Sequence, residues 1–245
     1  MTDSNPTIPT PSGILIIDKD LKFTSMDVCA IVRTRLRRGG APKRIKVGHG
    51  GTLDPLATGV LVVLVGKCTP LCNVIMVGQK EYAAEIDLSA FTTTDDAEGP
   101  REEVGVATPP TREQIEAVLP RFVGEIMQMP PAFSALKVGG RKACDMAREG
   151  EAPPLAARPV RIDAIVVERY EWPRLAVHVT SGKGVYIRSL ARDIGTALGT
   201  GGHLAALRRT RVGQFDLAQA KKLDELADVL KQEHLRPPPS EMGEG

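Results

Sequence analysis

One short segment concentrates the residue types that could do chemistry. Gly48–Gly59 (GHGGTLDPLATG) places a single carboxylate, Asp54, among four glycines and directly before Pro55. Glycine lets the backbone pass close to a ligand or adopt positive φ, and the residue before proline is held extended. Such a rigid loop could present Asp54 as a nucleophile or a proton acceptor. A structural Asx turn is the commoner alternative for a lone Asp in a glycine-rich loop. The loop lacks the Gly-Lys-Ser/Thr ending of a P-loop, so it is a weak phosphate cradle.

The elements around this loop follow from the apolar pattern. Val60–Val65 is a continuous β-branched and aliphatic run between two glycines, which predicts a strand covered on both faces. Gly13–Asp18 predicts a second short buried strand. A helix is expected to start at the cap hydroxyls of Thr24 or Ser25 and to end at Gly39–Gly40. Asp54 would then lie at the edge of a buried strand.

The second half of the chain mixes strands and helices without regular βαβ alternation. Tyr82 lies on a strand of alternating apolar and polar residues, and TTTDDAEGP (92–100) reads as a loop. Thr111 and Gln114 form a capping box. The remaining expected elements are strands over 161–170 and 174–180, and helices over 141–149, 187–198 and 223–230. This order predicts an α+β fold with a central mixed or antiparallel sheet flanked by helices and loops.

Length and composition bound the organisation. The chain has 245 residues, 42% of them hydrophobic, enough for one large or two small domains. We expect disordered tails over 1–12 and 236–245 and one domain over 13–235. The amino terminus does not resemble a secretory signal, and Val60–Val65 is too short to span a membrane. A cytoplasmic protein is the resulting expectation.

Positive charge is unevenly distributed although the net charge is only +2. No acidic residue lies between Asp27 and Asp54, and Arg208, Arg209 and Arg211 form a second cluster. Local basic density attracts phosphate backbones, while a solvated helix face and polar loop is the competing interpretation. The basic residues of the acid-free segment are Arg33, Arg35, Arg37, Arg38, Lys43, Arg44 and Lys46.

The four cysteines do not suggest a metal site. Cys68 and Cys72 have three residues between them, and no second Cys pair or His pair completes a zinc site. Small buried thiols in a reducing cytosol are the better interpretation of these two and of Cys29 and Cys144.

An ordered series of motifs now resembles a known family. GHGGTLDPLATGVL is similar to the catalytic loop of the TruB family of tRNA pseudouridine(55) synthases. The resemblance continues, in order and spacing, over about residues 13–230. Its further blocks are KEY (80–82), TDDAEG (94–99), PPAFSALK (130–137), GVYIRSLARDIG (184–195) and LRRT (207–210).

The resemblance implies a pseudouridine synthase fold and isomerisation of uridine to pseudouridine without metal, redox group or other cofactor. It makes Asp54 the catalytic carboxylate, by covalent attack or by a glycal route, which the sequence does not separate. Arg188 would pair with Asp54 and favour its ionised form. Tyr82 would stack on the uracil and is a candidate acceptor for the C5 proton. Without the resemblance, Arg188 reads as a surface or capping residue and Tyr82 as a core tyrosine.

Four further residues match family positions at the substrate. His49 would contact the flipped-out nucleotide, Tyr186 would stack or contact phosphate, and Asp96 would help order the active site. Lys19 follows the first strand. Their ordinary alternatives are a turn-stabilising histidine, a core tyrosine, a loop cap and an exposed charge.

The implied substrate is the T-stem-loop of tRNA. A stacked uridine must be extruded before its C1′–N1 bond can be reached, at a cost of about a few kcal/mol. The two basic clusters would hold the folded RNA. A small RNA-gripping insertion is expected at about 130–155, and many relatives carry a C-terminal RNA-binding PUA domain for which we see no room after Leu235. The proposed phosphate contacts are Lys137, Arg141, Lys142, Arg148 and Arg208.

Rival functions stay open at this point. A guide-RNA-dependent relative that modifies ribosomal RNA shares the GTLDP and KEY blocks. A non-catalytic RNA-binding protein is a second rival, and a glycosidase with paired carboxylates is disfavoured because Asp95 and Asp96 are adjacent. The family also implies a monomer without protein partners.

Overall fold

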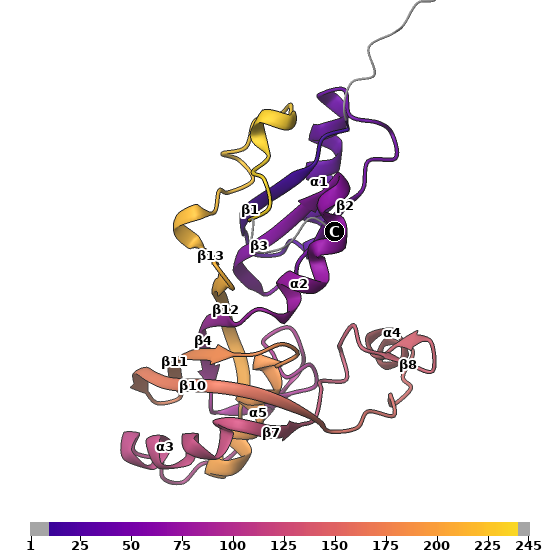
Figure 1. Ribbon diagram of the computed structural model, residues 1–245. Coiled ribbons are helices and arrows are strands. Elements are labelled where there is room, and N and C mark those ends of the chain that lie inside the picture. The colour runs from indigo at the N-terminus through magenta and orange to yellow at the C-terminus, as the bar shows by residue number, and fades with distance from the viewer. Residues whose placement is uncertain (1–9, 240–245) are drawn as a thin grey trace, which may run out of the picture. The chain divides into compact units, whose positions relative to one another are not determined.

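The computed structural model describes residues 10–239, and these fold as two compact units (Figure 1). The first contains residues 10–78 and 209–239, and the second contains residues 79–208. The sequence predicted a single domain over 13–235, so the division into two units is a finding of the structure. The chain passes between the units at residues 78–79 and again within strand β12 (His203–Val212).

The first unit is built on two long antiparallel strands. β1 (Gly13–Lys19) pairs with β3 (Ala57–Val65) from Gly13 opposite Val65 to Lys19 opposite Gly59. Residues Val60 to Val65 are fully buried, as the continuous apolar run predicts. β2 (Val47–His49) pairs with the end of β3, and β12 follows β3 in the strand order. β13 (Phe215–Asp216) pairs with the last two residues of β12. The Asp54 loop therefore connects two strands of one buried sheet.

Helix α1 (Ser25–Arg38) has the predicted ends. Thr24 is its N-cap and forms a capping box with Asp27, and Gly39 follows its last turn. Its apolar stripe of Val28, Val32 and Leu36 is buried. After β3, a 3-10 turn (Gly66–Leu71) leads into the short helix α2 (Cys72–Val77), whose Ile75 joins the same core.

The helix predicted over 223–230 is wrong: that segment is a series of turns and bends. The Arg35 side chain donates to the carbonyls of Leu223 (2.7 Å) and Leu226 (3.0 Å), and the Leu230 amide donates to the Arg35 carbonyl (3.1 Å). These tertiary bonds satisfy backbone groups that a helix would have paired locally. Leu223 and Leu230 still bury their side chains, which explains the apolar spacing.

Both predicted tails are shorter than expected. The Ser12 amide donates to Gln232 Oε1 (2.9 Å), and Ile14 and Arg236 exchange two backbone bonds of 2.8 and 3.0 Å. Residues 10–12 and 236 are thus tied to the first unit. The remaining tail residues 1–9 and 240–245 lie outside the described residues.

The second unit is an antiparallel sheet with helices. Its strand order is β4 (Lys80–Asp87), β11 (Arg174–Ser181), β10 (Arg158–Glu171) and β7 (Gly124–Gln128). The predicted strands over 161–170 and 174–180 are β10 and β11, paired antiparallel. Helix α5 (Ile187–Leu198) buries Ile187, Leu190 and Ile194. Helix α3 (Arg112–Val118) starts at the predicted capping box and continues as a 3-10 turn (Leu119–Phe122).

Two small substructures complete this unit. β5 (Ala90–Thr92) and β6 (Arg101–Glu103) form a hairpin whose connection is the acidic loop. Between β7 and β10 lies the expected insertion, made of β8 (Lys137–Val138), β9 (Arg141–Lys142) and α4 (Ala143–Arg148). Figure 1 shows this insertion standing apart from the sheet of its unit on extended connections.

The predicted α+β class is confirmed, with strands and helices mixed in both units. Among residues 10–239, no helix has the length and apolar character needed to cross a membrane. All four cysteines are free thiols. Cys29 and Cys68 are buried as predicted, whereas Cys72 and Cys144 are partly exposed.

Candidate active site

The Asp54 loop is tethered on both sides of its carboxylate. The buried Ser25 hydroxyl accepts from the Leu53 amide (2.8 Å) and donates to the Leu53 carbonyl (3.1 Å). On the other side the Lys22 amide donates to the Pro55 carbonyl (2.8 Å), and a turn closes from the Asp54 carbonyl to the Ala57 amide (3.0 Å). The backbone on either side of Asp54 is therefore fixed, while its side chain keeps partial exposure.

Arg209 supports the same loop from inside the unit. Its side chain is only 2% exposed. It donates to the carbonyls of Val60 (2.8 Å), Gly51 (3.0 Å) and Thr52 (3.3 Å). Gly59 allows this approach, because a Cβ there would lie 2.2 Å from the Arg209 carbonyl oxygen. The basic cluster of Arg208, Arg209 and Arg211 predicted a phosphate contact, whereas the Arg209 side chain is buried and bonded to backbone carbonyls.

Lys19 is fully buried, so the interpretation as an exposed charge is wrong. Its ammonium donates to the carbonyls of Phe23 (2.6 Å) and Asp20 (2.9 Å). Burial lowers the pKa of Lys19 to about 8 from its ordinary 10.5, with Arg209 adding to the lowering, while the Asp54 carboxylate acts in the opposite direction. Lys19 and Asp54 are thus electrostatically coupled within the first unit.

This lowered pKa has a consequence for stability. Between pH 8 and 10.5 the unfolded chain keeps the Lys19 proton that the folded chain releases, so unfolding becomes less favourable as pH rises. We expect the unfolding free energy of the wild type, relative to Lys19→Met, to rise by about 3 kcal/mol across that window. Urea unfolding at pH 7.5, 9 and 10.5 measures it. The exposed Lys67→Met variant should show no such trend, and a flat Lys19 difference would contradict the prediction.

His49 ends β2 at the start of the same loop. Burial is the main cause that lowers its pKa, and the positive charge of Arg209 adds to it, while a bond with the Gly51 backbone opposes it. The imidazole is therefore neutral near pH 7. Its buried Nδ1 has no hydrogen-bond partner among the described residues. A neutral ring suits a nucleotide contact better than proton donation, and the contact with the nucleotide stays a prediction.

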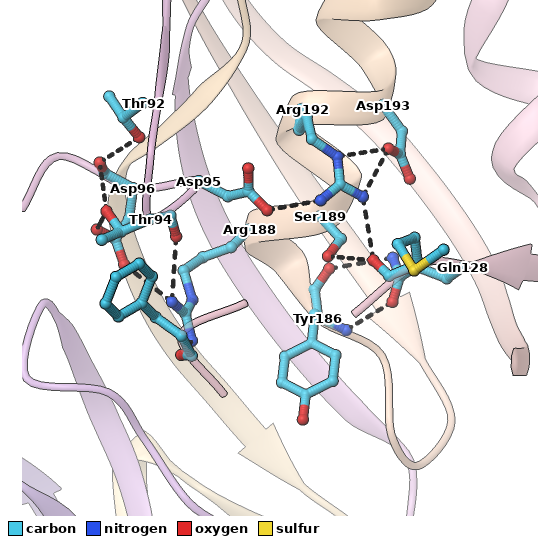
Figure 2. Close-up of polar contacts among 12 residues, drawn as sticks. Thr92, Thr94, Asp95, Asp96, Gln128, Tyr186, Arg188, Ser189, Arg192 and Asp193 are labelled. Carbon is cyan, nitrogen blue, oxygen red and sulfur yellow. Dashed lines mark hydrogen bonds and ion pairs between the residues drawn. The ribbon is translucent and has the colours of Figure 1, made fainter. Parts of the chain in front are cut away.

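In the second unit, Arg188 is the centre of a buried polar cluster (Figure 2). It lies on the first turn of α5 and is 5% exposed. Its guanidinium lies 3.3 Å from Asp96 Oδ2 and donates to the carbonyls of Phe133 (3.0 Å) and Thr94 (3.2 Å). One side chain thus joins α5, the acidic loop and the start of the insertion.

The acidic loop is ordered around Asp96. Its Oδ1 accepts from the Thr94 hydroxyl (2.6 Å) and the Glu98 amide (3.1 Å), so it is a loop cap as well as an ion-pair partner. The neighbouring Asp95 pairs with Arg192 Nη1 at 2.7 Å, one helical turn along α5 (Figure 2). Burial raises the pKa of Asp95, and Arg192 and Arg188 oppose that rise. Two arginines of one helix therefore hold two adjacent carboxylates of the loop.

Tyr186 caps the start of α5. The Gln128 side chain binds its backbone twice, accepting from the amide (2.9 Å) and donating to the carbonyl (3.1 Å). The Arg158 guanidinium lies 5.2 Å from the centre of its ring, within cation–π range. In Figure 2 the ring points away from the Arg192–Asp193 contacts. The backbone is held while the half-exposed ring is left for another contact.

Tyr82 lies on the buried face of β4, opposite Val179 of β11, and is 8% exposed. The strand predicted from the alternation of apolar and polar residues is confirmed, since buried and half-buried side chains alternate along β4. Asp54 belongs to the first unit, whereas Tyr82 and Arg188 belong to the second. Their joint action therefore stays a prediction.

The insertion presents a concentrated positive charge. Lys137 and Lys142 are directly opposite each other across the β8–β9 pair, and both are exposed. Like charges at such positions repel, and a polyanion would relieve the repulsion. Arg141 differs, because it pairs with Glu149 and with Glu151 (2.8 Å), an arrangement that fastens the hairpin to the segment after α4.

The basic clusters contain both internal and exposed residues. Arg33 donates to the Val47 carbonyl (3.1 Å), and Arg37 to that of Lys43. With Arg35 they hold backbone of their own unit. The basic residues of this segment that stay exposed are Arg37, Arg38, Lys43, Arg44 and Lys46, and Arg208 is half-buried.

Sequence reasoning missed four residues that position this site: Ser25, Gln128, Arg192 and Arg209. Ser25 was considered only as a helix cap beside Thr24. The other three bind partners that lie far away along the chain. The separations are 58 residues for Gln128, 97 for Arg192 and 158 for Arg209. No local pattern signals such long-range bonds.

Comparison with known proteins defines the class first. Residues 38–187 match the family model described as TruB family pseudouridylate synthase (N terminal domain), and residues 188–238 match the tRNA pseudouridylate synthase B C-terminal domain. The class is therefore that of pseudouridylate synthases, as the motif series indicated. The chain belongs to the TruB family.

Relatives of known sequence support the same assignment. The chain is 50% identical over 218 residues to the tRNA pseudouridine synthase B of Gluconobacter oxydans, covering 88% of this chain and 63% of that protein. It is 47% identical over 223 residues to that of Mycobacterium bovis, covering 89% and 73%. The chain thus spans less than two thirds of the Gluconobacter relative.

Solved structures confirm the fold. The crystal structure of a Cbf5-Nop10-Gar1 complex matches with a TM-score of 0.66 at 30% identity, covering 91% of this chain and 59% of that one. An H/ACA RNP bound to a substrate RNA containing 2′-deoxyuridine matches with 0.63 at 29%, covering 87% and 52%. This chain spans little more than half the length of the matched chain in each of these structures.

Proposed function

We propose that this protein isomerises uridine to pseudouridine at position 55 in the T loop of tRNA. The observation that carries the proposal is the Asp54 loop. Its carboxylate is partly exposed on backbone that buried Ser25 and Arg209 hold in place, in a chain of the pseudouridylate synthase family. Enzymes gain rate by fixing a reactive group before the substrate arrives.

The proposed chemistry balances within the substrate. The C1′–N1 bond of the uridine breaks, the base turns, and a C1′–C5 bond forms, while C5 loses one proton and N1 gains one. No electron donor or phosphoryl donor is consumed, and we expect no cofactor. Asp54 acts at the sugar–base junction, and Tyr82 holds the base and takes part in removing the C5 proton.

Arg188 has the role of an electrostatic positioner in this scheme. We propose that it pairs with Asp54 in the complex with substrate and keeps that carboxylate ionised. The buried ion pair with Asp96 supports this role, since it aims the guanidinium and is held by the ordered acidic loop. Arg188 and Asp96 would then act together as one hydrogen-bonded network.

RNA binding is assigned to exposed charge and to the half-exposed rings of His49 and Tyr186. The insertion would grip the backbone through Lys137 and Lys142, with Arg208 and the exposed part of the Arg33–Lys46 segment adding contacts. His49 and Tyr186 would contact the extruded nucleotide. Its extrusion costs about a few kcal/mol, which these contacts offset.

The proposed contacts between the insertion and the RNA backbone can be tested by salt dependence. Lys137→Gln with Lys142→Gln should raise the Kd for transcribed tRNA and reduce the slope of log K against log salt by about 1.5, because two phosphate neutralisations are lost. Filter binding between 50 and 300 mM salt measures this. Arg141 is left intact, since its pairs with Glu149 and Glu151 hold the hairpin. The charge-matched control is Lys67→Gln with Lys231→Gln, and equal slopes for the two double variants would refute the grip.

The function itself is tested by mapping pseudouridine on an unmodified, transcribed tRNA. Purified protein should convert the T-loop uridine without added metal or guide RNA. A product at another uridine would retain the chemistry and reject the position. Binding without any product would reject the enzymatic proposal.

A second candidate rests on the structural matches to H/ACA complexes at 29–30% identity. It is a guide-dependent synthase acting on ribosomal RNA with protein partners. Higher identity to proteins named tRNA pseudouridine synthase B favours the first candidate. Conversion of ribosomal RNA only in the presence of guide RNA would favour the second. In the first scheme the protein acts as a monomer in the cytoplasm.

A further inference from the structure

Arg209 stands out among the charged residues of the first unit. Its neighbour Arg208 is half-buried, whereas Arg209 is 2% exposed. A buried guanidinium is costly unless its donors are satisfied. Three of its bonds go to backbone carbonyls, and two of these carbonyls belong to Gly51 and Thr52, shortly before Asp54 in the chain.

The third bond locks the other end of the loop. Arg209 Nε donates to Val60 at 2.8 Å, at the start of the buried part of β3. The backbone of Arg209 lies against Gly59, where a Cβ would come within 2.2 Å of its carbonyl oxygen. One side chain thus binds the segment before Asp54, at Gly51 and Thr52, and strand β3 after it, at Val60. A planar guanidinium can span such separated acceptors, and a lysine ammonium cannot.

We infer that Arg209 is a positioning residue for catalysis, which clamps the Asp54 loop through its carbonyls and contacts no RNA phosphate. This inference rests on the proposed function. Its charge also acts on the site, because it contributes to the lowered pKa of His49 and of Lys19. Arg209 therefore sets both the path of the loop and the electrostatic surroundings of its carboxylate.

The test separates geometry, charge and phosphate binding. Arg209→Met should lower kcat by about 100-fold, since a misplacement of about 1 Å has effects of that size. The Kd for tRNA and its salt slope should not change, whereas a lost phosphate contact would reduce the slope by about 0.7 to 0.9. Arg209→Lys keeps the charge but not the clamp, so its kcat should stay close to that of the Met variant.

A matched control excludes a general effect of losing a buried arginine. Arg35 also donates to two backbone carbonyls of the first unit, those of Leu223 and Leu226. It is therefore not among the exposed residues proposed to contact RNA. Arg35→Met should lower the melting temperature, and its kcat at a temperature where it is folded should fall far less than that of Arg209→Met. Equal kcat losses in the two Met variants would overturn the inference.

A readout without turnover keeps this test distinct from the proposed function. The NMR titration of the His49 ring should give a higher pKa in Arg209→Met and a nearly unchanged one in Arg209→Lys, because burial and the Gly51 bond persist while only the nearby charge differs. If the wild type makes no pseudouridine, the proposed function fails and this shift still tests the placement of Arg209. An unchanged His49 pKa with unchanged kcat would refute the positioning role.

Discussion

Asp54→Asn is expected to abolish pseudouridine formation, with a loss of about 10⁴-fold or more, the upper end of what one acid–base group contributes. The amide is nearly isosteric but can neither attack as an anion nor accept a proton. The backbone on either side of residue 54 is held by Ser25, Lys22 and Arg209, so the loop should stay in place. Single-turnover conversion of a transcribed tRNA gives the rate.

The controls for this variant test whether the loss is chemical. Asp224→Asn makes the same change at an exposed carboxylate of the same unit and should keep full activity. Binding of tRNA by Asp54→Asn should remain within a factor of about two, since the carboxylate adds no attraction for phosphate. Residual turnover above a hundredth of the wild-type rate would show that Asp54 is not the essential group.

Arg188→Met is expected to affect both stability and rate. The substitution leaves Asp96 buried without its charge partner and removes the bonds to Thr94 and Phe133. Breaking a buried pair from one side costs about 3–5 kcal/mol, and removing one group that stabilises charge in the active site costs about 10²–10³ in kcat. Urea unfolding and single-turnover rates measure the two effects.

Paired variants separate the ion pair from the rest of the network. Arg188→Met with Asp96→Asn should unfold less easily than the sum of the single losses implies, because no uncompensated charge remains. The exposed pair of Arg112 and Glu116, 2.8 Å apart, is the control. Arg112→Met should cost only about 0.5 kcal/mol. Strict additivity at Arg188 and Asp96 would mean that the two residues do not act together.

Local signals in the sequence determined most of the elements. Helix ends are set by residues that lie close together in the chain, so they can be predicted from the sequence. Examples are the capping boxes at Thr24 and Thr111 and the glycine after Arg38. The aliphatic run of β3 and the alternation of β4 likewise depend on the chemistry of consecutive residues. The motif series determined the family, because many spaced residues agree in order.

Only the tertiary structure decided where the basic side chains go. Arg35 and Arg209 look like surface charges in the sequence, but both bind backbone carbonyls of residues distant in the chain. The apolar spacing over 223–230 is typical of a helix, yet bonds from Arg35 keep that segment irregular. Lys19 is equally unremarkable in sequence, and its burial is created by packing. Burial and long-range hydrogen bonds depend on which segments fold together, so types and spacing of residues along the chain do not specify them.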